Sequence, residues 1–390
     1  MYNIPIMKII FSLHAVKFCL LLAILYLLLP FPVFAQDQEI VPIQDFRKAQ
    51  VIRVLEEGEK EVYGNTQPYQ LIELKILNGS DEGQIIKLEH GGRFRLKDSQ
   101  KVVAGETVVL YRSGFNNQVD EYQIIDKYRL DKIIFIVLGF FVLVLAISRL
   151  KGLGSILGLI VSFIVIIQFI IPQILQGNDP VMISIIGSSI IMVATLYLAH
   201  GFSKKTTVAL ISTIISLIIT GLLAALFVKV ANLSGLGDET AAGFTLNPLL
   251  QTINLKGLLL GGMIIGTLGV LDDVTTTQTS TIFELKHTDK TLSFTELLKR
   301  GFRVGKDHIS SVVNTLILAY TGASLPLLLL IVLNPSAQPL WAILNNESIV
   351  EEVIRMIGGS TGLVLAVPIT TILASYVCTK LIRPSQVKGI

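Results

Sequence analysis

Two adjacent acidic residues inside an apolar stretch have the types and position best suited to chemistry. Only 15 uncharged residues separate Lys256 from Asp272, about 22 Å of helix, which is too short to cross about 30 Å of hydrocarbon. If the helix continues to Ser280, Asp272 and Asp273 lie within a membrane segment. Acids there are costly and usually functional, so the pair could exchange a proton or cation with neighbouring hydroxyls. The alternative is that the helix ends at Leu271 and a solvated loop follows.

Helical spacing divides the residues around the two acids between two faces. One stripe contains glycines that would let a neighbouring helix approach closely; it comprises Gly262, Gly266, Gly269, Asp273, Thr277, Ser280 and Glu284. The adjacent face comprises Ile265, Leu268, Asp272, Thr275, Thr276 and Thr279. Later apolar stretches add Ser310, Ser311, Asn314 and Thr321 on one face, and Thr371 and Ser375 after Pro368.

From these faces we select two groups of candidate residues. The candidates for binding an ion or substrate are Asp272, Asp273, Thr276, Thr277, Gln278, Ser280 and Asn314. The candidates for helix packing are Gly262, Gly266 and Gly269.

Enzyme motifs fail on inspection. Gly358–Gly362 matches the G-x-S-x-G pattern, but Ser360 would lie at the opposite side of the bilayer from His200 and His308, so it lacks a general base. Gly301–Lys306 is one residue short of a phosphate-binding loop. The sequence therefore predicts no enzyme, no cofactor and no metal site.

The elements that must position these residues are membrane helices. Hydrophobic residues make up 52% of the 390 residues and charged residues 16%, which excludes a purely soluble protein. We predict an all-α bundle of seven transmembrane helices within residues 132–382. The crossings are Ile133–Ser148, Gly152–Gln173, Val181–His200, Thr206–Val228, Gly257–Leu271, Ile309–Leu333 and Gly359–Lys380.

The N-terminal third has a different character. Residues 1–35 are typical of a secretory signal peptide, with an uncleaved anchor helix as the alternative. Residues 36–131 alternate in polarity over five short segments, which favours a small β-barrel of the OB or SH3 type. The segments are Ala49–Leu55, Tyr69–Leu77, Gln84–His90, Thr107–Arg112 and Glu121–Tyr128. Because this domain is acidic and extracytoplasmic, we expect a rigid cap or a ligand sensor, not a nucleic-acid binder.

Basic residues predict the orientation. One set of connections and the C-terminal end carry thirteen Lys and Arg residues and the opposite set carries three, which places the barrel outside the plasma membrane and the tail 383–390 in the cytoplasm. The longest inner loop contains the capping-box pattern Ser293–Glu296, which predicts an amphipathic helix at residues 293–304 on the inner membrane surface. If the leader is removed, Cys378 alone remains, so no intramolecular disulfide is expected.

The stretch Leu268–Val274, followed by Thr277-Gln278 and Glu284-Leu285, resembles the signature of the YibE/F family of bacterial membrane proteins. The segments Ile76–Gly79 and Ile125–Arg129 are similar to the N-terminal half of that family, so the resemblance covers roughly residues 45–382. Thr275 and Thr276 depart from it, because a more apolar or alanine-containing run is expected there. The resemblance implies a multi-pass membrane protein whose biochemical activity is not established.

Two functions follow from these residues. The first is a secondary transporter or channel-like protein in which Asp272 and Asp273 bind a proton or cation, with Asn314 nearby. The second is a non-catalytic scaffold in which the outer barrel recruits a protein partner and the glycine stripe assembles helices, including those of a homo-oligomer. Both functions place the chain in the lipid bilayer.

Overall fold

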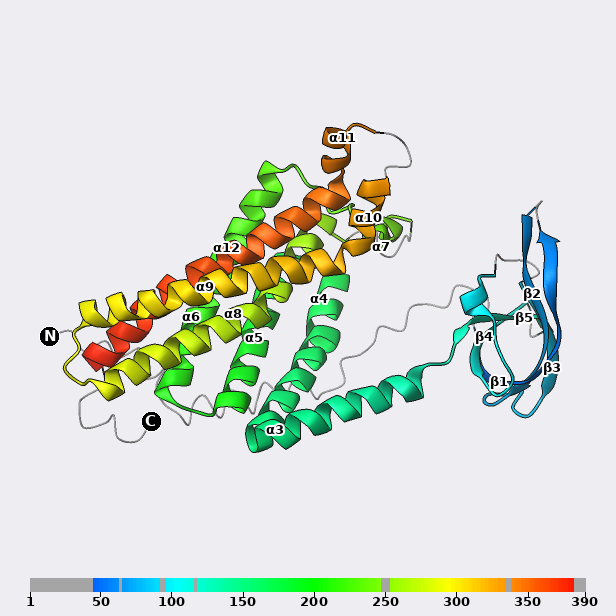
Figure 1. Ribbon diagram of the computed structural model, residues 1–390, viewed down its shortest axis with the longest axis horizontal. Helices are drawn as coiled ribbons and strands as arrows, with labels where there is room; N and C mark the ends of the chain where they lie inside the picture. Colours follow the sequence, from blue (N-terminus) through cyan, green and yellow to red (C-terminus); the bar gives the residue numbers. More distant parts are fainter. Residues whose placement is uncertain are drawn as a thin grey trace. The chain divides into compact units, whose positions relative to one another are not determined.

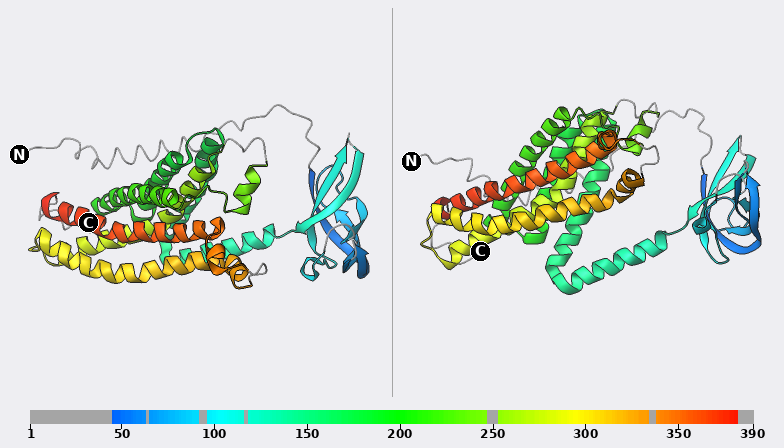
Figure 2. Two further views of the ribbon diagram at one scale, coloured as in Figure 1. Left: turned by 90° about the horizontal axis from the view of Figure 1, so that it is seen from above. Right: turned by 45° about the horizontal axis from the view of Figure 1, so that its top comes forward.

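The computed structural model describes residues 45–62, 65–91, 96–115, 118–246, 253–333 and 338–381. The expected signal peptide and the C-terminal tail lie outside the described residues. The described chain forms two compact units, one ending at Leu143 and the other beginning at Val144. Figures 1 and 2 show the β-strands of the first unit and the helices of the second.

The first unit contains an antiparallel sheet with the strand order β3-β2-β1-β4-β5. The strands are β1 Asp45–Val62, β2 Asn65–Ile76, β3 Ile85–His90, β4 Thr107–Phe115 and β5 Gln118–Lys127. The five predicted strands are therefore confirmed. Alternate apolar side chains form the core of this unit, as period-2 patterning requires; they are Ala49, Val51, Ile72, Leu74, Ile76, Val102, Val108, Leu110 and Ile124.

The prediction of a closed barrel is wrong. β3 and β5 are the two edges of the sheet, and no ladder joins them in the described part of this unit. β1 has 18 residues and pairs with β2 along most of its length, whereas β3 has six residues and pairs only with β2. Alternating polarity identifies strands and their buried face, but closure depends on edge pairing, which that pattern does not encode.

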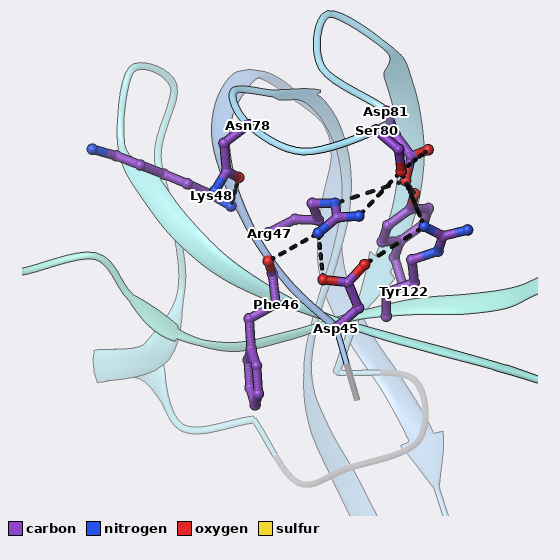
Figure 3. Close-up of polar contacts among 9 residues, drawn as sticks. Asp45, Phe46, Arg47, Lys48, Asn78, Ser80, Asp81 and Tyr122 are labelled. Carbon is purple, nitrogen blue, oxygen red and sulfur yellow. Dashed lines mark hydrogen bonds and ion pairs between the residues drawn. The ribbon is translucent and has the colours of Figure 1, made fainter. Parts of the chain in front are cut away.

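A cluster of charged side chains connects four parts of the sheet unit (Figure 3). Arg47 of β1 forms an ion pair with Asp45. Arg112 Nη1 of β4 lies 3.1 Å from Asp81 Oδ2 in the β2–β3 turn, and the Tyr122 hydroxyl of β5 donates to the same oxygen at 2.9 Å. The Tyr122 hydrogen bond, helped by the nearby guanidinium groups, holds the pKa of Asp81 below its usual range.

The second unit is helical. After α3 Leu130–Val165 and the π-helix η2 Ile166–Ile170, its helices are α4 Ile171–Leu175, α5 Pro180–His200, α6 Lys204–Val230, α7 Glu239–Phe244, α8 Leu255–Thr288, α9 Phe294–Ala323, α10 Leu325–Leu333, α11 Leu340–Leu344, α12 Glu347–Tyr376 and the π-helix η3 Val377–Leu381. α3 breaks at Arg149, where φ is 50°. Within the described ranges, six helices are long and apolar enough to cross a membrane, or up to seven if α9 and α10, bent by 70°, form one span.

Three helices form the centre of the helical unit. α6, α8 and α12 pack against one another, α5 packs on α6 and α8, and α9 packs on α12 and α8 (Figures 1 and 2). Close approach depends on Gly362 of α12, because a Cβ there would overlap the Thr220 side chain of α6. The apolar centre includes Leu217, Ile264, Leu271 and Leu363.

α9 is longer than the amphipathic helix expected at residues 293–304. Its capping box forms as predicted, since Ser293 N donates to Glu296 Oε2 at 2.8 Å and Glu296 N donates to Ser293 Oγ at 3.4 Å. The helix then continues to Ala323 instead of ending near residue 304. Gly301 and Gly305 are buried and allow this part of α9 to pack on α8 and α12.

Candidate functional site

Asp272 and Asp273 lie in the middle of one continuous helix. α8 starts after its N-cap Asn254, whose side chain accepts from Gly257 N, and ends at Thr288. The alternative in which the helix ends at Leu271 is therefore wrong. The 34 residues of α8 give a length of about 50 Å, which exceeds the roughly 30 Å of a bilayer's hydrocarbon core.

The two acids have different surroundings. Asp273 is exposed, whereas Asp272 is half-buried and its Oδ1 is enclosed without a hydrogen-bond partner among the described residues. Asp272 lies three helical turns beyond Gly261, so both residues share one face of α8. A Cβ at Gly261 would lie 2.5 Å from Ser184 Oγ, which identifies that face as the one packed on α5. The helix thus separates an enclosed carboxylate from an exposed one.

The hydroxyl of Thr275 joins α8 to α6. Thr275 is fully buried, and its Oγ1 lies 2.5 Å from Oγ1 of Thr213, which is also fully buried. The same hydroxyl donates to the main-chain oxygen of Asp272 at 3.2 Å, and Thr276 Oγ1 donates to that oxygen at 2.9 Å. At the position where the family resemblance suggested an apolar residue, Thr275 therefore supplies a hydrogen bond between helices.

Gln278 connects three helices. Its Nε2 donates to the main-chain oxygen of Gly301 in α9 at 2.9 Å and to Thr371 Oγ1 in α12 at 2.7 Å. The side chain is buried. Its amide therefore connects α8, α9 and α12 to one another, one and a half turns beyond the acids.

The remaining predicted binding residues lie elsewhere on the surface of the helices. Thr277 is exposed, and its main-chain oxygen accepts from Thr281 at 3.0 Å. Ser280 is half-buried. Asn314 is exposed on α9, and no hydrogen bond between it and Asp272 is present in the described structure. Gln278 is thus the only one of the candidates whose side chain makes a hydrogen bond between helices in the described ranges.

The predicted glycine stripe faces outward. Gly262, Gly266 and Gly269 are exposed. A Cβ at Gly262 or Gly269 would have no atom within 4 Å, and one at Gly266 would meet only the Tyr320 hydroxyl at 3.1 Å. Among the helices that the structure describes, none packs on Gly262 or Gly269, because the buried faces of α8 lie on its other side. Packing of these two glycines against another chain stays a prediction.

Buried hydroxyl groups line several helices of this unit, and the sequence had pointed only to some of them, such as Thr279 and Ser375, and not to those of α5 and α6. Seven of them, from α5, α6, α8 and α12, have no hydrogen-bond partner within the described ranges; they are Ser184, Ser188, Ser216, Thr279, Ser360, Thr370 and Ser375. A pattern of regularly spaced hydroxyl residues is visible in the sequence of α6, where Thr206, Thr213 and Thr220 recur at seven-residue intervals. Hydroxyl and carboxylate oxygens suit proton relays and hard cations. Among the described residues, no group of three or more His, Cys, Asp or Glu side chains could hold a metal.

Two further carboxylates hold the connection that follows α6. Glu347 Oε1, at the start of α12, accepts from Ser234 N at 2.5 Å and from Gly235 N at 3.1 Å. Glu351, one turn later and 3% exposed, accepts from Gly237 N at 3.0 Å. The first two turns of α12 are thereby bonded to the backbone between α6 and α7.

The comparisons with known proteins concern the helical part. No curated protein and no solved structure matches the chain. The family model described as YibE/F-like protein matches residues 136–380. This range begins in α3, contains both acids and the buried hydroxyls, and leaves out the five-stranded sheet. The match covers more than half of the sequence, and the chain therefore belongs to the YibE/F-like protein family.

Proposed function

We propose that the chain is a multi-pass plasma-membrane protein, not an enzyme, that moves a proton or a small cation across the bilayer. The observation that carries this proposal is the enclosed Oδ1 of Asp272, in the middle of a continuous apolar helix and without a described hydrogen-bond partner. An acid in that position is costly unless it has a function.

The membrane placement follows from the helices and their charges. Six or seven helices are long and apolar enough to span a bilayer. The excess of Lys and Arg in one set of connections supports an orientation with the sheet unit outside and the C-terminus inside. With this orientation the first turns of α12 lie at the outer surface, and the start of α9 lies at the inner surface.

Asp272 can act as the site that is loaded and unloaded. An enclosed carboxylate without a basic partner is stabilised when it binds a proton or a cation, because binding removes the unpaired charge. No ion pair between Asp272 and a basic side chain is present in the described residues. Asp273 lies one residue further on the exposed side of α8.

Reconstituted protein tests the proposal. In liposomes with an imposed pH or cation gradient, we expect Asp272→Asn to reduce flux by about tenfold or more, because the neutral amide has no charge to compensate. Asp273→Asn is the matched control, one residue away on the exposed face, and should keep more than half of the flux. Flux that is unchanged in Asp272→Asn, or no greater with protein than in empty liposomes, would contradict the proposal.

The outward glycine stripe favours a second candidate function, a scaffold formed by several copies of the chain. A Cβ at Gly262 or Gly269 would meet no atom of the described residues within 4 Å, and glycine faces of this kind allow close contact between membrane helices. Counting chains per nanodisc by photobleaching tests this function, since Gly269→Leu should turn oligomers into monomers. A wild-type protein that is already monomeric would rule it out.

A further inference from the structure

The buried face of α9 defines the direction in which its other side chains point. A Cβ at Gly301 would lie 2.9 Å from Thr371 Cγ2 and would overlap Ile282, and one at Gly305 would overlap Val367. These two glycines therefore mark the side of α9 that packs on α8 and α12. The side half a turn away points away from α8 and α12.

Residues on that outward side change in chemical type along the helix. At spacings of three and four residues the outward face consists of Lys299, Arg303, Lys306, Ser310, Asn314 and Ile317. All six are exposed. The order is three cations, then a hydroxyl and an amide, then an apolar side chain beside exposed Leu318. We call these six residues the outward face of α9.

The cations on this face are available to a ligand. None of the three forms an ion pair with a residue that the structure describes. Arg300 adds a fourth positive charge, and the nearest acids on the helix are Asp307 and Glu296. The carboxylate of Glu296 is already used, because it accepts from Ser293 in the capping box. The net charge of residues 299–307 is positive.

The order of chemical types along this face resembles the order of groups in a phospholipid. The cationic part spans residues 299–306, about 10 Å, and Ser310 and Asn314 follow over about another 10 Å before the apolar part begins. A phosphate, an ester-bearing glycerol and an acyl chain occur in the same order in a phospholipid.

We propose that the outward face of α9 binds an anionic phospholipid. Its phosphate lies at Lys299, Arg303 and Lys306, its glycerol region lies at Ser310 and Asn314, and an acyl chain lies along Ile317. The inference rests on the membrane placement proposed above and does not depend on transport. It also gives Asn314 a role distinct from the ion site at which the sequence analysis placed it.

A titration with soluble lipids tests this inference on the full chain in detergent. The probe is dioctanoyl phosphatidylglycerol, with dioctanoyl phosphatidylcholine and inorganic phosphate as comparisons, and the readout is the melting temperature. We expect the melting temperature to rise saturably with the anionic lipid and not with the other two compounds. In K299Q/R303Q/K306Q the apparent affinity should fall by about 100-fold, because each basic residue contributes about fivefold.

Two matched variants separate binding at this face from general charge. K87Q/K97Q/K229Q removes three exposed lysines elsewhere and should bind like the wild type. K299R/R303K/K306R keeps the charge and should also bind, which shows that the positions tolerate substitution. The inference is overturned if K87Q/K97Q/K229Q loses as much affinity as K299Q/R303Q/K306Q, or if K299Q/R303Q/K306Q binds like the wild type. It is also overturned if phosphate alone raises the melting temperature as much as the anionic lipid does. These readouts need no flux, so a failure of the transport proposal is recorded separately.

Discussion

The hydroxyl oxygens of Thr213 and Thr275 lie 2.5 Å apart at the contact between α6 and α8, and both side chains are fully buried. Each hydroxyl also reaches a main-chain oxygen of its own helix, Ala209 at 2.9 Å and Asp272 at 3.2 Å respectively. Because a hydroxyl has one proton, one of these groups donates across the contact while the other donates along its helix. The contact between the helices beside Asp272 is therefore polar and directional.

The loss of unfolding free energy on removing one hydroxyl of this pair should be more than half of the loss on removing both. We expect Thr213→Val or Thr275→Val to lower the free energy of unfolding by about 1–3 kcal/mol, because the remaining hydroxyl loses its partner in a buried site. The double variant should lose less than the sum of the two single variants. Thermal unfolding in detergent measures all three, and strictly additive losses would show that the hydroxyls are not coupled.

Two glycines provide a matched test of the packing. Gly362→Ala should destabilise the helical unit by about 1–3 kcal/mol, because the new Cβ would overlap Thr220. Gly262→Ala makes the same chemical change on the exposed side of α8 and should be neutral or stabilising by up to about 1 kcal/mol, because alanine favours helix. Melting temperatures of the two proteins should move in different directions. Equal losses would contradict the assignment of buried and outward faces.

The charged cluster of the sheet unit should make that unit sensitive to acid. The pKa of Asp81 is lowered in the folded protein from the ordinary 3.8, mainly by the Tyr122 hydrogen bond. Its stabilising contribution is therefore complete above pH 3.8 and is lost as the pH falls through the lower folded value. Hydrogen exchange of β4 and β5 between pH 6 and pH 2.5 should rise more steeply with acid in the wild type than in Asp81→Asn. Parallel curves would show that Asp81 does not supply the acid dependence.

Local sequence patterns predicted much of the fold. Strand alternation located all five strands, because each strand has one buried face and its period is two. The Ser293–Glu296 capping box located the start of α9, because capping involves residues only three apart. The short apolar length between Lys256 and Asp272 favoured a helix that continues past Leu271 over one that ends there, and α8 does continue.

Relationships between distant segments were less accessible from the sequence. Glycines on α8 suggested helix packing, but the glycines enclosed by neighbouring helices include Gly301, Gly305 and Gly362 on α9 and α12. Spacing within one helix shows which residues share a face, but not which face a neighbour covers. The same limit explains why closure of the sheet was predicted wrongly and why the partner of Thr275 was not predicted. Both depend on contacts between distant segments, and Thr213 is 62 residues from Thr275.

The bonds between α12 and the connection after α6 have a mechanical consequence. Glu347 and Glu351 hold the main chain from Ser234 to Gly237, and Ser348 donates to the oxygen of Gly237. The beginning of α12 and this connection should therefore move as one rigid body. If α12 tilts relative to α8, this connection must move with it. Otherwise α12 must bend further along, at Pro368, which removes one hydrogen bond from the helix.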